Sequence, residues 1–183
     1  MNKMSAVKKI CVTAICIALC CVLPTAFHSV GLGTAFSPIH IPALLCGIVC
    51  GPWYGLACGF VGPILSSLIT SMPGPAMLPS MVPELIAYGL ITGLMMQLVH
   101  TKKLYADPYI SLATAMVLGR VVGGIAKALV YMGSGEAFSL AIWASSYFVS
   151  TLPGIVCHLI LIPVLYFALT KARLIPARYP KGA

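Results

Sequence analysis

Long apolar blocks, separated by short segments rich in glycine, proline or lysine, constrain this chain more than any other feature. They run over about 9–27, 39–51, 54–71, 82–99, 109–131 and 141–169. Hydrophobic residues make up 60% of the chain and charged residues only 8%, too few for the polar surface of a soluble domain. A transmembrane barrel would instead need segments of about ten residues with alternating hydrophobicity. The sequence therefore predicts an all-α integral membrane protein, folded as one domain over residues 1–183.

Positive charge gathers before the first block, after the fourth and after the last. The residues concerned are Lys3, Lys8, Lys9, Lys102, Lys103, Lys171, Arg173, Arg178 and Lys181. By the positive-inside rule these three segments are cytoplasmic, which predicts a bundle of six transmembrane helices with cytoplasmic N- and C-termini. The formal charge of +8 thus indicates orientation in a membrane, and we expect no binding to nucleic acid. The first block lacks a clear signal-peptide cleavage site, so we interpret it as a retained helix.

The second block is too short for an ordinary crossing. It lies within FSPIHIPALLCGIVCGPWYG, and residues 39–51 supply about two-thirds of the roughly 20 residues that a span needs. The preceding loop must then descend into the membrane, where irregular backbone is tolerated if it is buried in protein or lines a cavity. This predicts a pocket open to the outside, closed over by the stiff, proline-rich segment SMPGPAMLPS. The alternative is that both segments are only tight turns at helix starts, where proline is common.

Three ionisable residues lie at membrane depth or at its outer edge: Arg120, Lys127 and Glu84. A charge at the bilayer centre costs about 2.5–3.5 kcal/mol on insertion scales, so such a group should face a cavity or a partner. Seven residues make about 700° of helical rotation, which places Arg120 and Lys127 on one face of their helix. These residues either bind a ligand or form a structural pair, such as Glu84 with Lys127.

Other candidate pocket residues carry imidazole or aromatic rings. His40, in the first turn of the short helix, either hydrogen-bonds a ligand or caps the helix. The aromatic candidates in the outer halves of the later blocks are Tyr88, Tyr131, Trp143 and Tyr147. They would suit a flat or partly apolar ligand, although anchoring at the lipid interface fits them equally well. We expect His158 to be a packed, hydrogen-bonded core residue.

Small residues recur at helical spacing in two places. Gly47, Gly51, Gly55 and Gly59 follow one another every fourth residue, which predicts close helix packing. Ala14 and Ala18 repeat the spacing in the first block. The eight cysteines lie within apolar blocks and are interpreted as small buried residues rather than metal ligands or disulfides.

Enzymatic chemistry finds little support in the sequence. No Gly-rich loop with Lys-Ser/Thr is present to bind phosphates, so we predict that the chain does not hydrolyse ATP itself. We also expect no cofactor, no metal site and no catalytic residue. Active transport would need an outside source of energy. The alternative is a small membrane enzyme or an assembly factor that uses the same cavity.

Several runs resemble one known family. SPIHIP with GPWYG, GRVVGGIAKALVY and TLPGIVCHLILIPVLYFAL are similar to the substrate-binding (S) components of energy-coupling-factor (ECF) transporters, nearly from end to end. The resemblance implies a six-helix subunit of an ABC-type importer in a bacterial cytoplasmic membrane, which captures a vitamin and reorients to release it. It also implies a transmembrane coupling protein (T component) and two separate ATPases as partners. Ala14 and Ala18 stand where the family has its docking patch for the coupling protein.

The family's ligands bind between the outer halves of helices four to six, which agrees with the predicted pocket. Related carriers take pantothenate, a hydroxymethylpyrimidine or cobalamin precursors. Pantothenate is our narrow hypothesis, because its carboxylate would suit Arg120 or Lys127. The nickel and cobalt branch has a histidine close after the initiating methionine, and MNKM lacks it, so we do not expect a metal substrate.

Overall fold

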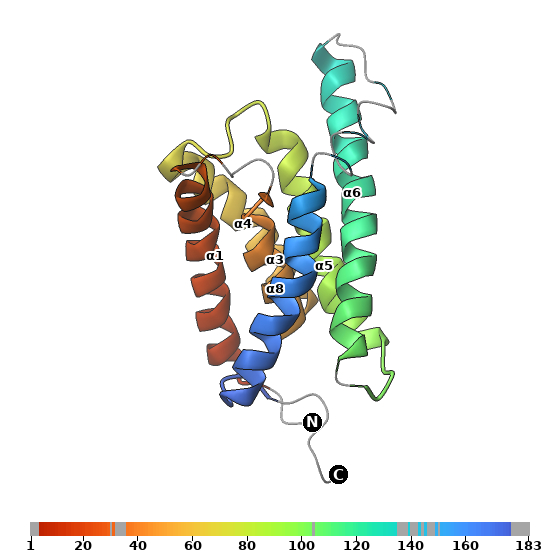
Figure 1. Ribbon diagram of the computed structural model, residues 1–183. Helices are drawn as coiled ribbons and strands as arrows, with labels where there is room; N and C mark the ends of the chain where they lie inside the picture. Colours follow the sequence, from red (N-terminus) through yellow and green to blue (C-terminus); the bar gives the residue numbers. More distant parts are fainter. Residues whose placement is uncertain are drawn as a thin grey trace.

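Six helices account for most of the chain that the structure describes. The structure is a computed structural model that describes residues 4–29, 31, 36–103, 105–134, 139, 143, 145, 149 and 151–176. The helices are α1 (Ala6–Ser29), α3 (His40–Cys50), α4 (Pro52–Thr70), α5 (Leu78–Leu98), α6 (Ala106–Ser134) and α8 (Leu152–Lys171). They run roughly parallel to one long axis, and the start of α1 lies at the same end of the bundle as the end of α8 (Figure 1).

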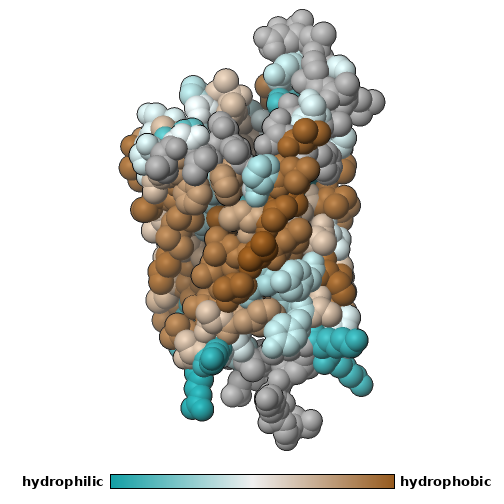
Figure 2. Space-filling view, viewed as in Figure 1, coloured by the Kyte–Doolittle hydropathy of each residue, from teal (hydrophilic) through white to brown (hydrophobic). Residues whose placement is uncertain are grey.

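Five of these helices, α1, α4, α5, α6 and α8, are long and apolar enough to cross a membrane. Within the described ranges no residue is in a strand, so the all-α prediction is confirmed there. Figure 2 shows apolar side chains over the middle of the visible face and hydrophilic ones below them. The orientation of the termini and the number of full crossings stay predictions.

The described helix of the last apolar block, α8, starts well inside the block that was predicted over residues 141–169. Helix α8 begins only at Leu152, with Thr151 before it and Pro153 in its first turn. Hydropathy alone did not separate this start from the preceding residues, because both sides of it contain enough apolar residues to be included in one block. A proline in the first turn is a helix-start signal, since its missing N–H has no intrahelical partner there.

Helix α3 is the short helix predicted from the broken second block, and it lies inside the bundle. It has 11 residues, of which all but Val49 are buried. It packs against α1, α4, α5, α6 and α8, so protein surrounds it (Figure 1). A helix in this position need not match the membrane thickness, because other helices surround it.

Five glycines allow α3 and α4 to touch α5 backbone to backbone. We call Gly47, Gly55, Gly59, Gly89 and Gly93 the glycine seam. A Cβ atom added at Gly55 would lie 2.7 Å from the carbonyl carbon of Gly89, closer than real Cβ atoms come. The predicted packing role of Gly47, Gly55 and Gly59 is confirmed, whereas Gly51 serves the corner between α3 and α4 with a φ of 100°.

Hydrogen bonds of buried cysteine thiols connect α1 with α3 and with the residue that precedes it. The Cys46 thiol lies 3.5 Å from the Thr13 hydroxyl, and the Cys50 thiol donates to the Lys9 carbonyl at 3.7 Å. Cys20 reaches the Ile39 carbonyl in the same way, at 3.9 Å. The interpretation as small buried residues is confirmed for these three cysteines, while Cys11 is exposed.

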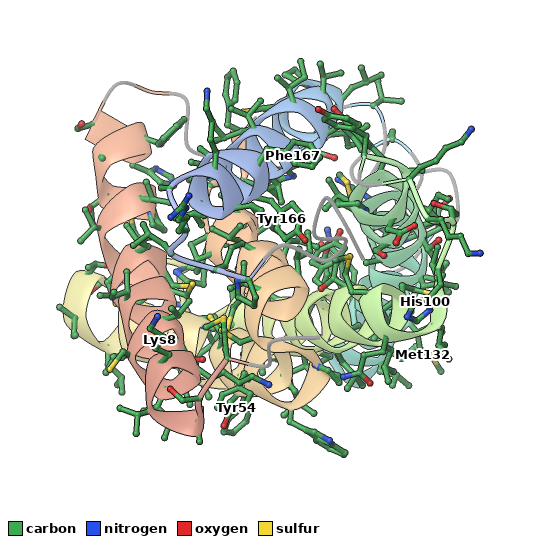
Figure 3. The ribbon with its side chains drawn as sticks, turned by 90° about the horizontal axis from the view of Figure 1, so that it is seen from below. Lys8, Tyr54, His100, Met132, Tyr166 and Phe167 are labelled. Carbon is green, nitrogen blue, oxygen red and sulfur yellow. The ribbon has the colours of Figure 1, made fainter. Side chains whose placement is uncertain are left out.

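The end of the bundle that holds the start of α1 carries basic and aromatic side chains. Lys8 lies in the first turn of α1, Tyr54 in the first turn of α4 and His100 just after α5; all three are labelled in Figure 3, which is seen from below. The ammonium group of Lys9 lies 5.5 Å from the centre of the Tyr54 ring. Aromatic and basic residues are typical of membrane interfaces, so this end matches the segment predicted to be cytoplasmic.

Candidate functional site

A cavity of about 580 Å³ lies at the opposite end of the bundle. It is formed by the turn before α3, the start of α5, the second half of α6 and the residue that precedes α8. Its lining residues are Ser37, His40, Ala76, Met77, Pro79, Ser80, Met81, Glu84, Arg120, Lys127, Val130, Tyr131 and Thr151. Ligand pockets commonly measure about 300–1,000 Å³, so this volume suits a small organic molecule.

Five of the residues predicted for a pocket line this cavity. They are His40, Glu84, Arg120, Lys127 and Tyr131. They come from α3, α5 and α6, and the bundle brings them together from positions far apart in the chain.

His40 is fixed at the inner wall by contacts on both ring nitrogens. It is 7% exposed, and its Nδ1 lies 3.0 Å from the Ser37 carbonyl oxygen. Its Nε2 lies 3.5 Å from Oε1 of Glu84. The His40 side chain therefore bonds the turn before its own helix and also reaches α5. It lines the cavity, whereas α3 has no side-chain cap, so the capping alternative is not borne out.

Glu84 belongs to a group of three side chains that are in contact with one another. The Tyr88 hydroxyl, one helical turn further along α5, donates to Oε1 of Glu84 at 2.9 Å. The Tyr88 ring lies edge-on to the His40 ring, with 5.1 Å between ring centres. We call Glu84, His40 and Tyr88 the acceptor triad, because the Glu84 carboxylate is the group that the other two hold.

Tyr88 does not line the cavity, contrary to the prediction of an aromatic wall. Its side chain is 1% exposed, and its ring occupies the space beside Gly119 of α6, where a Cβ would collide with it. Spacing along α5 could not distinguish a ring that faces the ligand from a ring that packs behind a carboxylate. The Tyr88 ring is therefore buried behind Glu84, which lines the cavity.

Arg120 and Lys127 both face the cavity, as the helical spacing predicted. Arg120 is 6% exposed; it donates to the Met116 carbonyl at 3.5 Å and to the Thr151 hydroxyl at 3.3 Å. Lys127 is partly buried, and its ammonium group lies 5.8 Å from the centre of the Tyr131 ring. The described ion pair of Glu84 is with His40, which differs from the structural pair with Lys127 considered from sequence.

The two remaining aromatic candidates are Trp143 and Tyr147. Trp143 packs its indole against Gly124 of α6 and is not among the lining residues. Tyr147 lies outside the described residues.

His158 of α8 packs beside His40. The two rings have centres 5.9 Å apart, and His158 is 2% exposed. It is packed as predicted, but within the described part of the chain its Nε2 has no hydrogen-bond partner.

The proline-rich segment that was predicted to close over the pocket contributes Ala76, Met77, Pro79 and Ser80 to the cavity lining. Sequence reasoning missed Met81 and Val130, which carry no functional signal of their own. Thr151 had a signal, because it precedes Pro153 at a helix start, and its hydroxyl accepts from Arg120.

Ala14 and Ala18 do not line the cavity; they lie on the exposed side of α1. Their neighbours Ile10, Ile15 and Val22 are 58%, 61% and 58% exposed. The opposite face of α1, with Thr13, Cys16 and Cys20, is the face that packs on the bundle.

The arrangement fits binding better than catalysis. Two fixed cations on α6 stand beside one carboxylate that already has an imidazole and a hydroxyl as partners. Such a cavity suits a small molecule that carries an anionic group, because cations buried at membrane depth are stabilised by an opposite charge.

The comparisons with known proteins agree with this picture. The family model of the substrate-specific component of ECF transporters matches residues 8–169. No curated protein and no solved structure matches the chain. Since the match covers residues 8–169 of the 183-residue chain, the chain belongs to the family of substrate-specific components of ECF transporters.

Proposed function

We propose that this chain captures a water-soluble vitamin or vitamin precursor in the cavity lined by His40, Glu84, Arg120 and Lys127. The observation that carries the proposal is the pair of cations on one face of α6, turned into a cavity of about 580 Å³. Two buried or half-buried cations are costly in a membrane protein unless function requires them. Pantothenate is the specific candidate, because its carboxylate complements Lys127 and its size fits the cavity.

The cavity opens to the outside of a bacterial cytoplasmic membrane in this proposal. Lys8, Lys9, Lys102, Lys103 and Lys171 are at the opposite end of the bundle, and the positive-inside rule assigns that end to the cytoplasm. Captured ligand must then cross to the cytoplasm, which we propose happens when the whole subunit reorients in the membrane.

Energy comes from partners, namely a transmembrane coupling protein and two ATPase subunits. Ala14 and Ala18 are proposed as the docking patch for the coupling protein. Their exposed position on α1 supports a role outside the bundle, because small residues let a second helix approach closely.

The decisive experiment is mass spectrometry of small molecules that co-purify with the detergent-solubilised protein. The expected result is an acidic vitamin or precursor present in the wild type and depleted in Lys127→Met purified in parallel. Recovery of a neutral or cationic molecule whose occupancy is unaffected by Lys127→Met would contradict the proposed site. A calorimetric titration with pantothenate then tests the specific candidate.

A further inference from the structure

Helices α5 and α6 run in opposite directions, and two contacts beside the cavity give their register. A Cβ added at Gly123 of α6 would lie 3.0 Å from Cβ of Glu84. A Cβ added at Gly119, one turn further into the bundle, would lie 3.2 Å from Cγ of Tyr88, one turn further along α5. The two helices therefore stay level turn by turn, so that a residue four before Glu84 lies level with a residue four after Gly123.

This register places Ser80 of α5 at the level of Lys127 of α6. Ser80 is four residues before Glu84, and Lys127 is four residues after Gly123. Both side chains are partly buried, and both line the cavity. Met77, one turn further out on α5, also lines the cavity and is 60% exposed. Ser80 and Lys127 therefore lie just inside the exposed end of the cavity, which we call the mouth.

The two cations of α6 are directed away from each other. Arg120 donates to the Met116 carbonyl, on the side away from the mouth, and to the Thr151 hydroxyl. The ammonium group of Lys127 lies 5.8 Å from the centre of the Tyr131 ring, one turn nearer the mouth. Their Cα atoms are about 10 Å apart along the helix axis. A carboxylate contacts a cation at about 2.7–2.9 Å, so one anionic group cannot bind both.

The Ser80 hydroxyl has a hydrogen bond that it can give up. It donates to the Met77 carbonyl of its own helix at 3.1 Å. That carbonyl also accepts the Met81 N–H at 3.0 Å, so it keeps a partner if the hydroxyl turns away. A serine hydroxyl rotates to suit its acceptor. At this level it can therefore add a hydrogen bond to a group that Lys127 holds.

We propose that Ser80 and Lys127 form one anion subsite just inside the mouth, where the Ser80 hydroxyl donates to the anionic group of the ligand. The inference rests on the proposed function and gives the orientation of the ligand. The anionic end lies toward the mouth, and the uncharged part extends toward Arg120 and Thr151. The substrate class is then an elongated molecule with one anionic group at its end. Arg120 needs no second anionic group, because its guanidinium already donates to two protein oxygens.

The test with ligand uses calorimetric titrations of the purified full chain with pantothenate and with its neutral alcohol, panthenol. Ser80→Ala should weaken pantothenate binding about tenfold, as expected for a hydrogen bond to a charged group, and should leave panthenol binding unchanged. Ser80→Thr keeps a hydroxyl and should stay within a few-fold of the wild type. In a Lys127→Met background, Ser80→Ala should cost less, because the anionic group is no longer held at this level.

Ser29→Ala is the matched control. Ser29 also donates to a carbonyl of its own helix, at 2.7 Å, but it does not line the cavity. This variant should bind both compounds as the wild type does. If Ser80→Ala binds pantothenate as the wild type does, or loses affinity for both compounds equally, the proposal is overturned.

A measurement without ligand separates this inference from the proposed function. Ser80→Cys and Ser29→Cys are each labelled with an anionic and a cationic methanethiosulfonate, and modification of the introduced thiol is followed by peptide mass spectrometry. The ratio of the anionic to the cationic rate cancels differences in thiol reactivity. It should be about tenfold higher at position 80 than at position 29, because Lys127 attracts the anionic reagent. Adding Lys127→Met should abolish this difference.

The labelling result holds for any vitamin. A difference between the two positions that is absent, or that persists in Lys127→Met, would show that the charge of Lys127 does not act at Ser80 and would overturn the subsite. If the difference is present and depends on Lys127 while the wild type does not bind pantothenate, the anion subsite is supported and pantothenate is not its ligand.

Discussion

The glycine seam and the cavity join neighbouring helices in different ways. In the seam, α3 and α4 meet the backbone of α5, with no space for a Cβ at Gly47, Gly55 or Gly59. Around the cavity, helices meet through polar side chains, as in the bond of 3.3 Å from Arg120 of α6 to Thr151 before α8. Side chains can change rotamer at small cost, whereas packed backbones cannot separate without losing many contacts. The glycine seam is therefore the rigid part of the bundle, which we call the frame, and the side chains of the cavity walls are the adjustable part.

Helix α5 belongs to both regions through two adjacent stripes. Leu85, Gly89 and Gly93 face α3 and α4, while Glu84 and Tyr88 face α3 and α6. One residue along a helix corresponds to about 100° of rotation, so the stripes lie side by side. The frame thus sets the position of the acceptor triad directly.

The largest effect should follow from a bulky residue in the seam. Gly89→Leu places a side chain where the backbone of Gly55 lies, and a backbone cannot move away as a flexible side chain can. Destabilisation should exceed about 3 kcal/mol, the upper end for overpacked cores. The measurement is the yield of monodisperse protein in detergent and the midpoint of its thermal unfolding.

Gly74→Ala is the matched control, because nothing lies within 4 Å of a Cβ built there. It should leave yield and midpoint unchanged. If Gly89→Leu also behaved like the wild type, α5 would be free to move away from α4 and the seam would not be a frame.

A bulky residue in place of a small one outside the glycine seam should leave the fold intact and abolish uptake instead. Ala18→Trp adds bulk to the exposed side of α1, so the fold and ligand binding should be retained. Uptake by cells that express the whole transporter should be abolished, because bulk prevents close approach of the coupling protein. Radiolabelled vitamin uptake and binding by the isolated subunit are measured in parallel.

Leu68→Trp provides the control for Ala18→Trp, since Leu68 is 78% exposed on a different helix, α4. It should leave both uptake and binding intact. Equal loss of binding and uptake in Ala18→Trp would mean that Ala18 packs within the bundle and would remove the docking proposal.

The sequence predicts the frame better than the cavity because the two depend on different information. Apolar blocks and glycine spacing are properties of one helix, so they identified the short α3 and the packing role of Gly55 and Gly59. Gly89 and Gly93 were missed as partners, since which helices meet depends on the tertiary fold. The common face of Arg120 and Lys127 was also predicted correctly, because their seven-residue spacing is a property of one helix.

The pairings around the cavity required three-dimensional information. A structural pair of Glu84 with Lys127 was one of two alternatives, but the described ion pair of Glu84 is with His40, whose Nδ1 contacts the Ser37 carbonyl. Tyr88 was expected to face the ligand, but the missing side chain at Gly119 gives its ring a buried site. Pairings of this kind depend on where a glycine on another helix leaves space, which no periodicity within one helix records.

Within the cavity, the largest effect should come from Lys127. Lys127→Met keeps the length of the side chain and removes its charge. Affinity for an anionic vitamin should fall by about 2–5 kcal/mol, the range for truncating one partner of a buried charge pair. Calorimetry with pantothenate and with panthenol, its neutral alcohol, gives the measurement, and only pantothenate should lose affinity.

Lys8→Met is the control for Lys127→Met, because Lys8 is exposed at the opposite end of the bundle. It should bind both compounds as the wild type does. Unchanged affinity of Lys127→Met for an anionic ligand would show that Lys127 is structural and would leave Arg120 as the candidate anchor.

The smallest effect should come from the polar link between α6 and α8. Thr151→Val keeps the shape of the side chain but removes the hydroxyl that accepts from Arg120, and Arg120 keeps its bond to the Met116 carbonyl. Because Thr151 is partly exposed and its bond is long, the loss should be about 1 kcal/mol, near the value of an ordinary hydrogen bond. Thermal unfolding of the empty protein and calorimetric affinity for pantothenate measure it, with Thr151→Ser as the variant that retains the hydroxyl. A loss in Thr151→Val as large as that of Gly89→Leu would mean that this link belongs to the rigid frame, and the distinction between a fixed seam and an adjustable cavity wall would fail.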